Sequence, residues 1–182
     1  MYRKSNPNSF IISCSGAVIV EFTFVVFIIT LLIKVLISVA TYQSTVGKLD
    51  RISYSIAGIV RERSKLYGSD YQLTQMQVEE LRNLAAKMLL NSGGNNNNLA
   101  IAIETLHFIP ATPEIKKIDN QNTRSIFLGD CQPIRPLRNM IDLSPYANTG
   151  RRIPLYQVTL CLPTTGGGLA IPVKSSAVTI ER

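Results

Sequence analysis

The segment Gly16-Ala-Val-Ile-Val-Glu21-Phe-Thr-Phe-Val-Val-Phe-Ile-Ile-Thr-Leu-Leu-Ile33, with its continuation to Tyr42, decides how this chain is organised. The 24 residues from Ala17 to Ala40 include two ionisable side chains, Glu21 and Lys34. A helix rises about 1.5 Å per residue, so this stretch would span roughly 36 Å, enough to cross a bilayer with some tilt. We therefore predict a transmembrane helix over residues 17–41.

A glycine, four apolar residues, a glutamate and an aromatic residue before a long hydrophobic run resemble the processing site of type IV pilins and pseudopilins. In that family a prepilin peptidase cuts after the glycine, here Gly16, and leaves Ala17 as the new N-terminus. The resemblance also implies that Glu21 pairs with the terminal amine of a neighbouring subunit. Such pairing is physically reasonable, because an unpaired charge near the centre of a membrane helix costs about 2.5–3.5 kcal/mol.

Three later segments make the resemblance more specific. They are Lys48-Leu-Asp-Arg-Ile-Ser-Tyr-Ser55, Val60-Arg-Glu-Arg-Ser-Lys-Leu-Tyr67 and Tyr156-Gln-Val-Thr-Leu-Cys-Leu-Pro163. Together they are similar to a TadF-type minor pseudopilin of the tight-adherence (Flp-type) pilus system. This resemblance implies a single-pass inner-membrane protein with a periplasmic C-terminal domain. The partners that it implies are the prepilin peptidase, the major pilin, a TadE-like pseudopilin and the inner-membrane assembly platform. Whether the protein enters the extracellular filament stays open.

The charge balance of the 182-residue chain is basic, with a net charge of +7. Removal of residues 1–16 takes away Arg3 and Lys4 and no acid, which leaves +5. No run of basic residues exceeds two, so the pattern predicts a solvated basic surface and no nucleic-acid interface. Arg61, Arg63 and Lys65 are the candidates for attraction to anionic lipid headgroups or to an acidic protein partner.

The three cysteines are an odd number, which needs an explanation in an exported protein. A cut after Gly16 removes Cys14 and leaves one pair, Cys131 and Cys161. A disulfide between them would persist in the oxidising periplasm. It would close a loop of about 30 residues and stabilise the fold by roughly 3–4 kcal/mol on the chain-entropy account. Two buried free thiols are the alternative.

Hydrophobic periodicity predicts an α+β fold with a long N-terminal helix, a second helix and a small antiparallel sheet, and the resemblance implies that this fold is pilin-like. Residues 1–16 form a leader, 17–41 the membrane helix and 42–182 the periplasmic domain. Within that domain, residues 42–67 continue the helix as a spine, 74–91 form the second helix and 99–182 the sheet. Thr74 and Gln77 fit a capping box. The apolar stripe of the spine is Val46, Leu49, Ile52, Ile56, Ile59 and Val60, and that of the second helix is Val78, Leu81, Leu84, Ala85, Met88 and Leu89.

Two other topologies stay open. Ser38-Val-Ala40 fits the small-x-small pattern of an ordinary signal-peptidase site, which would release a soluble periplasmic or secreted binding module beginning at Thr41. Alternatively, a single-span envelope protein would keep residues 1–16. The mature N-terminus distinguishes these topologies from a cut after Gly16.

The sequence contains no catalytic pattern, and we expect no enzymatic activity, cofactor or metal. The one histidine, His107, falls in a predicted strand, and the acids Glu104, Glu114, Asp119, Asp130 and Asp142 are scattered. The spacing of Cys131 and Cys161 differs from that of zinc or CxxC redox sites. Residues 133–154, with four prolines, predict a long ordered loop, and Thr164–Gly168 a hairpin turn.

Overall fold

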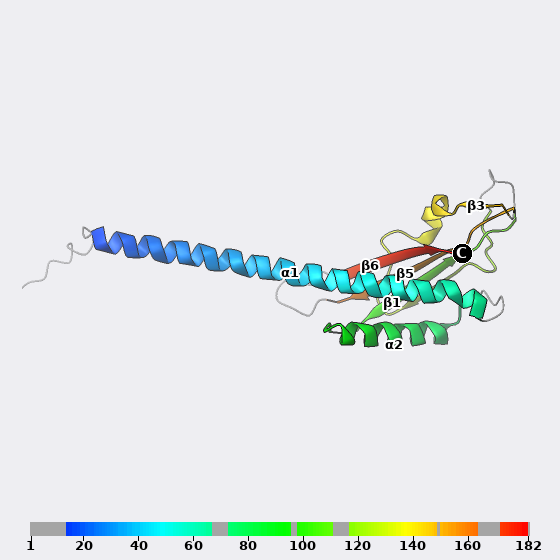
Figure 1. Ribbon diagram of the computed structural model, residues 1–182, viewed down its shortest axis with the longest axis horizontal. Coiled ribbons are helices and arrows are strands. Elements are labelled where there is room, and N and C mark those ends of the chain that lie inside the picture. The colour runs from blue at the N-terminus through cyan, green and yellow to red at the C-terminus, as the bar shows by residue number, and fades with distance from the viewer. Residues whose placement is uncertain are drawn as a thin grey trace, which may run out of the picture. The chain divides into compact units, whose positions relative to one another are not determined.

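The computed structural model describes residues 14–66, 73–95, 98–110, 117–148, 150–163 and 172–181. It confirms the predicted fold class, with a long apolar helix, a second helix and an antiparallel sheet (Figure 1). The chain divides into two compact units, Met1–Gln43 and Ser44–Arg182, and the second is called the head below. The elements are α1 (Cys14–Leu66), α2 (Gln75–Asn91), β1 (Ala100–Leu106), β2 (Arg124–Leu128), the 3-10 helix η2 (Leu137–Leu143), β3 (Tyr146–Ala147), β4 (Arg151–Arg152), β5 (Leu155–Leu162) and β6 (Val173–Ile180).

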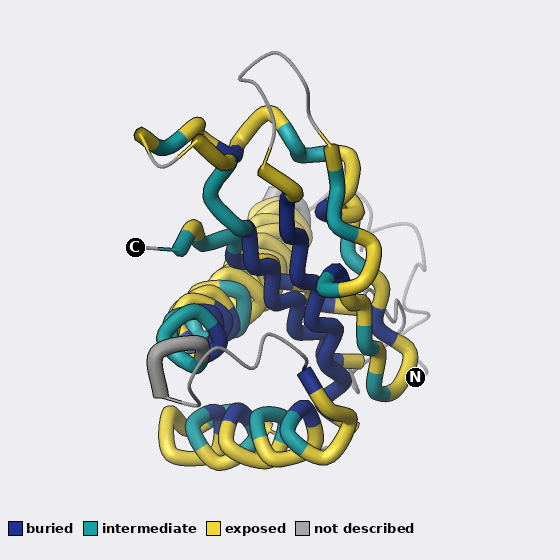
Figure 2. The backbone as a smooth tube through the Cα atoms, turned by 90° about the vertical axis from the view of Figure 1, so that its right-hand side faces the viewer, coloured by how far each residue is buried: buried dark blue, intermediate teal, exposed yellow. Residues whose placement is uncertain are grey.

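The main sheet of the head has four strands in the order β2-β1-β5-β6, and every neighbouring pair is antiparallel. The central strands β1 and β5 are buried along their whole length, as Figure 2 shows in dark blue. Ile103 lies opposite both Ile126 of β2 and Val158 of β5, which fixes the register of the three strands. Because both faces of the central strands are buried, both faces need a cover.

Helices cover one face of this sheet. The head portion of α1 and the whole of α2 pack against it and share one hydrophobic core with the strands. The side chains of that core that are fully or almost fully buried include Leu49, Ile52, Ile56 and Val60 of α1, Val78, Ala85 and Leu89 of α2, Ile101 and Ile103 of β1, and Val158 and Leu160 of β5.

Two of the predicted stripe positions are wrong. Ile59 is 42% exposed and Leu84 is 40% exposed. The buried face of α1 runs through Ser53 and Ala57, both fully buried, so Ile59 falls at its edge. In α2 the buried face contains Ala85. Leu84 precedes Ala85 by one residue, so its side chain points about 100° away from Ala85 around the helix.

The predicted capping box at the start of α2 is confirmed. The Thr74 side chain accepts a hydrogen bond from the Gln77 amide, and the Gln77 side chain accepts one from the Thr74 amide at 3.0 Å. Two amides at the helix start therefore have side-chain partners. Tyr67, the last residue of the predicted spine helix, and the predicted turn at Thr164–Gly168 lie outside the described residues.

A buried polar contact joins α1 to β6. Ser175 Oγ donates a hydrogen bond to Asp50 Oδ1 at 2.6 Å, and it lies 2.9 Å from the Oγ of fully buried Ser53. These residues are more than 120 positions apart in the sequence. Since a buried hydroxyl without a partner is costly, this contact fixes how far α1 slides along β6.

The opposite face of the sheet carries buried polar side chains between two small apolar clusters, and it is covered by the segment 129–144. Glu104 is only 6% exposed, and its Oε2 accepts a hydrogen bond from the Leu137 amide at 2.8 Å, at the start of η2. Beside it, Gln157 Nε2 donates to the Arg135 carbonyl oxygen at 3.2 Å and to Ser176 Oγ at 2.8 Å. A disulfide between Cys131 and Cys161, with a Cα–Cα distance of 5.5 Å, attaches the cover to β5.

The proline-rich segment 133–154, predicted as a long ordered loop, contains regular secondary structure. It includes η2 and the two-stranded β3–β4 sheet. Ser144 Oγ donates to the Ile153 carbonyl oxygen at 2.6 Å, and Arg152 Nη1 donates to the Ser144 carbonyl oxygen at 2.7 Å. The segment is therefore held at the disulfide, at Glu104 and at Ser144.

Candidate assembly site

The first unit of the chain offers an apolar helix whose described large side chains are exposed. Each large apolar side chain from Val18 to Val39 that the structure describes is between 44% and 68% exposed. Among the described residues one helix, α1, is long and apolar enough to cross a membrane, with a mean hydropathy of 2.7 over its most apolar window. An exposed apolar surface of this extent requires lipid or other protein as its surroundings.

The hydroxyl groups in this part of α1 are satisfied by the helix itself. Thr30, Ser38 and Thr41 each donate to the carbonyl oxygen four residues earlier, at 2.8–3.0 Å. Thr23 contacts the carbonyl oxygens of both Ile19 and Val20. These hydroxyls therefore do not oppose insertion into a bilayer, and the ionisable groups Glu21 and Lys34 remain as the polar exceptions.

The predicted processing residues Gly16 and Ala17 lie in the first turn of α1, which begins at Cys14. The Glu21 side chain is exposed on the same helix. Lys34 follows Glu21 by thirteen residues, about 20 Å along the helix, which is too far for an ion pair within one chain. Within the described part of this unit, Lys34 is therefore no ion-pair partner for Glu21.

The other predicted site residues lie in the head. Cys131 and Cys161 are both almost fully buried, at 1% and 2% exposure. In the described parts of the chain no group of three or more metal-binding side chains comes together.

His107, which directly follows β1, contributes to the packing of the head. It is 5% exposed, and its ring meets the Tyr156 ring edge-on with a centroid distance of 5.9 Å. Burial lowers the pKa of His107 below its usual range, and the nearby Asp119 charge opposes that effect in part. For Asp119 itself, the hydrogen bond from the Asn122 side chain, at 2.8 Å, is the main cause of a lowered carboxyl pKa.

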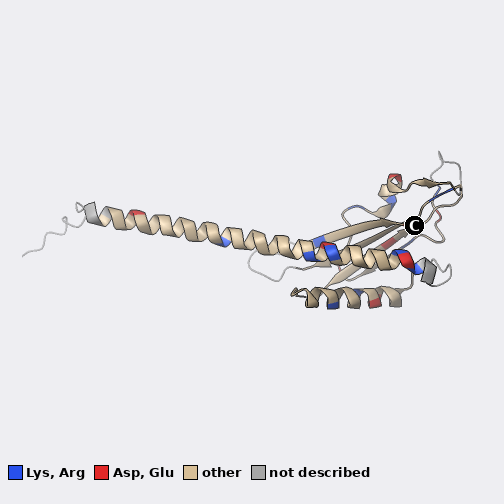
Figure 3. Ribbon diagram, in the orientation of Figure 1, with Lys and Arg blue, Asp and Glu red and all other residues tan. Residues whose placement is uncertain are grey.

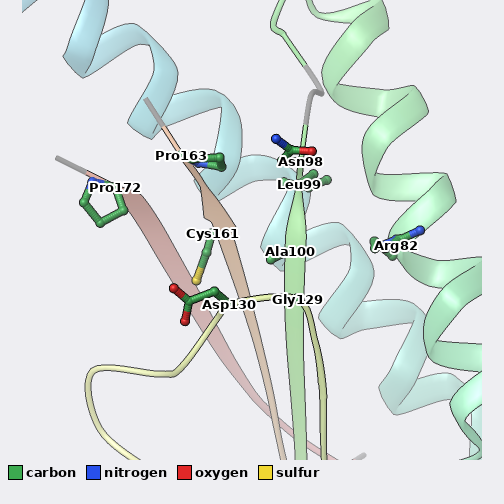
Figure 4. Close-up of a pocket in the computed structure, with 9 residues that line it drawn as sticks. All are labelled: Arg82, Asn98, Leu99, Ala100, Gly129, Asp130, Cys161, Pro163 and Pro172. Atoms are coloured by element: carbon green, nitrogen blue, oxygen red, sulfur yellow. The ribbon is translucent and has the colours of Figure 1, made fainter. Parts of the chain in front are cut away.

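An open recess of about 340 Å³ lies at one end of the sheet (Figure 4). Its apolar lining includes Leu99 at the start of β1, Cys161 and Pro163 at the end of β5, and Pro172 before β6. Arg82 of α2 and Asp130 of the cover segment are the charged side chains among the lining residues.

Comparison with known protein families assigns the chain to one of them. The family model TadF, described as Putative tight adherence pilin protein F, matches residues 10–168. The chain belongs to the TadF family. No curated protein and no solved structure matches it. The match begins before Gly16 and extends beyond β5, so it includes the apolar helix, α2 and most of the sheet. The TadF family member described here is therefore a component of a tight-adherence pilus system, and the resemblance found in the sequence is confirmed.

Sequence reasoning missed two polar groups that organise the head. Glu104 was one of several scattered acids, but it is buried and holds the start of η2. Its strand alternates apolar residues at 101 and 103, which indicated that Glu104 belongs to the other face, without indicating that this face is covered. Asp50 and Ser175 could not have been paired, because no local pattern connects positions 125 residues apart.

Proposed function

We propose that this TadF family protein is a minor pseudopilin that takes part in the assembly of an adhesive Flp-type pilus. A prepilin peptidase cuts after Gly16, residues 17–41 hold the protein in the inner membrane, and residues 42–182 lie in the periplasm. The protein then packs against other subunits through its apolar helix. Its role is structural and not enzymatic.

The observation that carries this proposal is the contrast between the exposed apolar side chains of residues 18–39 and the Glu21 carboxylate that interrupts them. In the described part of the chain the large apolar side chains of residues 18–39 are 44–68% exposed, and we infer that their partners are other molecules. Among the described residues of the first unit the cation is Lys34, which is about 20 Å from Glu21 along the helix and too far for an ion pair. An amine created at Ala17 of a neighbouring subunit supplies the missing charge at a similar depth.

The partners that follow are the prepilin peptidase, the major pilin, a TadE-like pseudopilin and the inner-membrane assembly platform. Each contributes either the cut or an apolar helix for packing. Release after Ala40 as a soluble module would remove the segment whose exposure needs explaining. In the structure Ser38, Val39 and Ala40 lie inside α1, which continues without a break to Leu66.

Deletion of the gene and complementation in the source organism test this function. The deletion strain should lose surface pili and tight adherence, and the wild-type gene should restore both. A Gly16→Leu gene should restore neither, and its product should run more slowly on a gel because the leader is kept. Normal piliation of the deletion strain would refute the assembly role, and restoration by the uncut Gly16→Leu protein would refute the processing step.

A further inference from the structure

We infer that the end of the head where α1 enters it is a docking surface for anionic phospholipid headgroups. The inference rests on the proposed function to the extent that residues 17–41 must be inserted in a bilayer. We call this surface the basic end, and it comprises Lys48, Arg51, Arg82, Lys87 and Lys174. Its first cations follow the apolar segment closely in the sequence, nearby acids do not balance its positive charge, and a recess lies beside it.

The basic end is assembled from three elements that are distant in sequence. Lys48 Nζ of α1 lies 3.4 Å from the carbonyl oxygen of Gly93, which follows the C-terminal end of α2. The bond between Asp50 and Ser175 brings the start of β6, and with it Lys174, to the same part of α1. Figure 3 shows blue ribbon on α1, on α2 and at the start of β6 in this region.

Among the residues that the structure describes, the cations of the basic end form no ion pair with a carboxylate. In the part of the chain that the structure describes, the ion pair is Arg61 with Glu62, at 2.9 Å, and it lies near the other end of α1. Lys48 and Lys174 contact backbone carbonyl oxygens, at 3.4 and 3.5 Å, and no carboxylate lies within salt-bridge distance of them. Arg51, Lys87 and Lys174 are exposed.

The acids near this end do not cancel the five cations. They are Asp50, whose Oδ1 is engaged by Ser175, and Asp130 at the recess. Residues 96–97 and 164–171, which adjoin this end in the chain, contain no charged residue in the sequence. The net charge of the basic end is therefore positive, which favours its binding to anionic surfaces over neutral ones.

The spacing along the chain matches a headgroup layer. Lys48 follows Ala40, the end of the apolar run, by eight residues, about 12 Å of helix. The headgroup region on one side of a bilayer is roughly 5–7 Å thick beyond the hydrocarbon, and a lysine side chain is long enough to bridge the remainder. The open recess that Arg82 lines gives a headgroup a concave surface to lie against (Figure 4).

The cations first considered for lipid attraction, Arg61, Arg63 and Lys65, are a poorer choice. Arg61 is paired with Glu62, and it follows Lys48 by thirteen residues, about 20 Å further along α1. Of Lys65 the structure describes only the backbone. The basic end is the better choice because it gathers cations from three elements, and because its Lys48 and Arg51 are the first cations that follow the apolar segment in the sequence.

Lipid crosslinking with the full chain in nanodiscs tests the inference. The discs contain equal amounts of phosphatidylglycerol and phosphatidylcholine, one of them carrying a photoactivatable headgroup in each experiment. The expected result is several-fold more crosslinking to phosphatidylglycerol, located by mass spectrometry at residues near 48–51, 87 and 174. The preference should shrink as salt rises from about 50 to 500 mM, because the Debye length falls well below 10 Å.

The key variant is Lys48→Gln/Arg51→Gln/Lys174→Gln, and the matched control is Arg124→Gln/Arg135→Gln/Arg138→Gln, which removes the same charge elsewhere on the head. The first should lose most of the preference, since each membrane-proximal cation contributes roughly fivefold in binding. The control should keep it. Equal crosslinking to both lipids, or equal loss in both variants, overturns the inference and favours an acidic protein as the partner of this surface.

The same experiment separates this inference from the proposed function. A chain that does not incorporate into nanodiscs contradicts the membrane anchoring and both proposals together. A chain that incorporates and shows no lipid preference contradicts the inference alone, and it leaves the assembly role unaffected.

Discussion

The two portions of α1 differ in the partners that their side chains have. Within residues 18–39, the large apolar side chains are exposed, and two ionisable groups interrupt them. Within residues 49–60, apolar side chains alternate between a buried face, including Leu49 and Ile56, and an outer face that includes Tyr54 at 60% exposure. The head portion is therefore satisfied by its own chain, while the apolar portion depends on other molecules. Changes in one should affect assembly, and changes in the other should affect folding.

The largest expected effect comes from Glu21→Gln. This change should abolish pilus assembly while the amount of protein and its thermal unfolding stay as in the wild type, because Glu21 belongs to the first unit of the chain and not to the folded head. Electron microscopy of surface pili and a melting curve of the purified protein measure the two effects. Lys34→Gln is the matched control, since a snorkelling lysine has no fixed partner and should leave assembly intact. Normal piliation with Glu21→Gln would show that the charge pairing is not needed.

The disulfide gives the largest expected effect on the head. Cys131→Ala with Cys161→Ala removes a bridge between residues 30 positions apart, which should lower the free energy of unfolding by about 3–4 kcal/mol. Denaturant unfolding with circular dichroism measures this loss. Cys14→Ser is the control, because Cys14 is predicted to leave with the leader and should then have no effect on the mature protein. Unchanged stability of the double variant would mean that Glu104 and Ser144 hold the cover segment without the bridge.

The matched pair Ile56→Val and Ile59→Val compares the two faces of the head portion of α1 with one chemical change. Ile56 is fully buried and Ile59 is 42% exposed. The first variant should lose about 1 kcal/mol of stability, and the second should stay within about 0.5 kcal/mol of the wild type. Unfolding titrations measure both. Equal losses would contradict the packing of α1 that places Ile59 at the edge.

The smallest expected effect concerns His107. Because burial lowers its pKa in the folded state, the unfolded chain binds the proton more readily than the native head does. Stability should therefore be fully present above the unfolded pKa of about 6.5, and it should fall as pH decreases from there toward the folded pKa. Melting temperatures between pH 7.5 and 5 measure this dependence.

His107→Phe serves as the control for that slope. Phenylalanine keeps an aromatic ring against Tyr156 and removes the titrating group, and the sequence has no other histidine. The variant should show a flatter profile in this range. An unchanged slope would assign the pH dependence to groups other than His107.

The sequence predicted what depends on local periodicity and cap chemistry. The long helix, the second helix with its Thr74 cap and the antiparallel sheet follow from patterns within one element. Prediction from the sequence failed where burial of a helix position depends on the element packed against it. Ile59 and Leu84 have the spacing of the apolar stripes on their helices, although neither side chain faces the core.

The polar interior was equally out of reach from the sequence. Glu104 is buried because the segment 129–144 packs over its face of the sheet, and the residues next to Glu104 in the sequence do not predict that packing. The same holds for the basic end, since Lys48 and Lys174 are 126 positions apart and only the Asp50–Ser175 contact brings their neighbours together. The candidate site at Gly16 and Glu21, by contrast, lies within one short motif and could be recognised at once.

The intact mass of the protein purified from membranes tests the central claim most directly. Our account predicts a chain that begins at Ala17, with its amine free to pair with Glu21 of a neighbour and with Cys14 absent. A chain that begins at Thr41, or one that keeps residues 1–16, would contradict it.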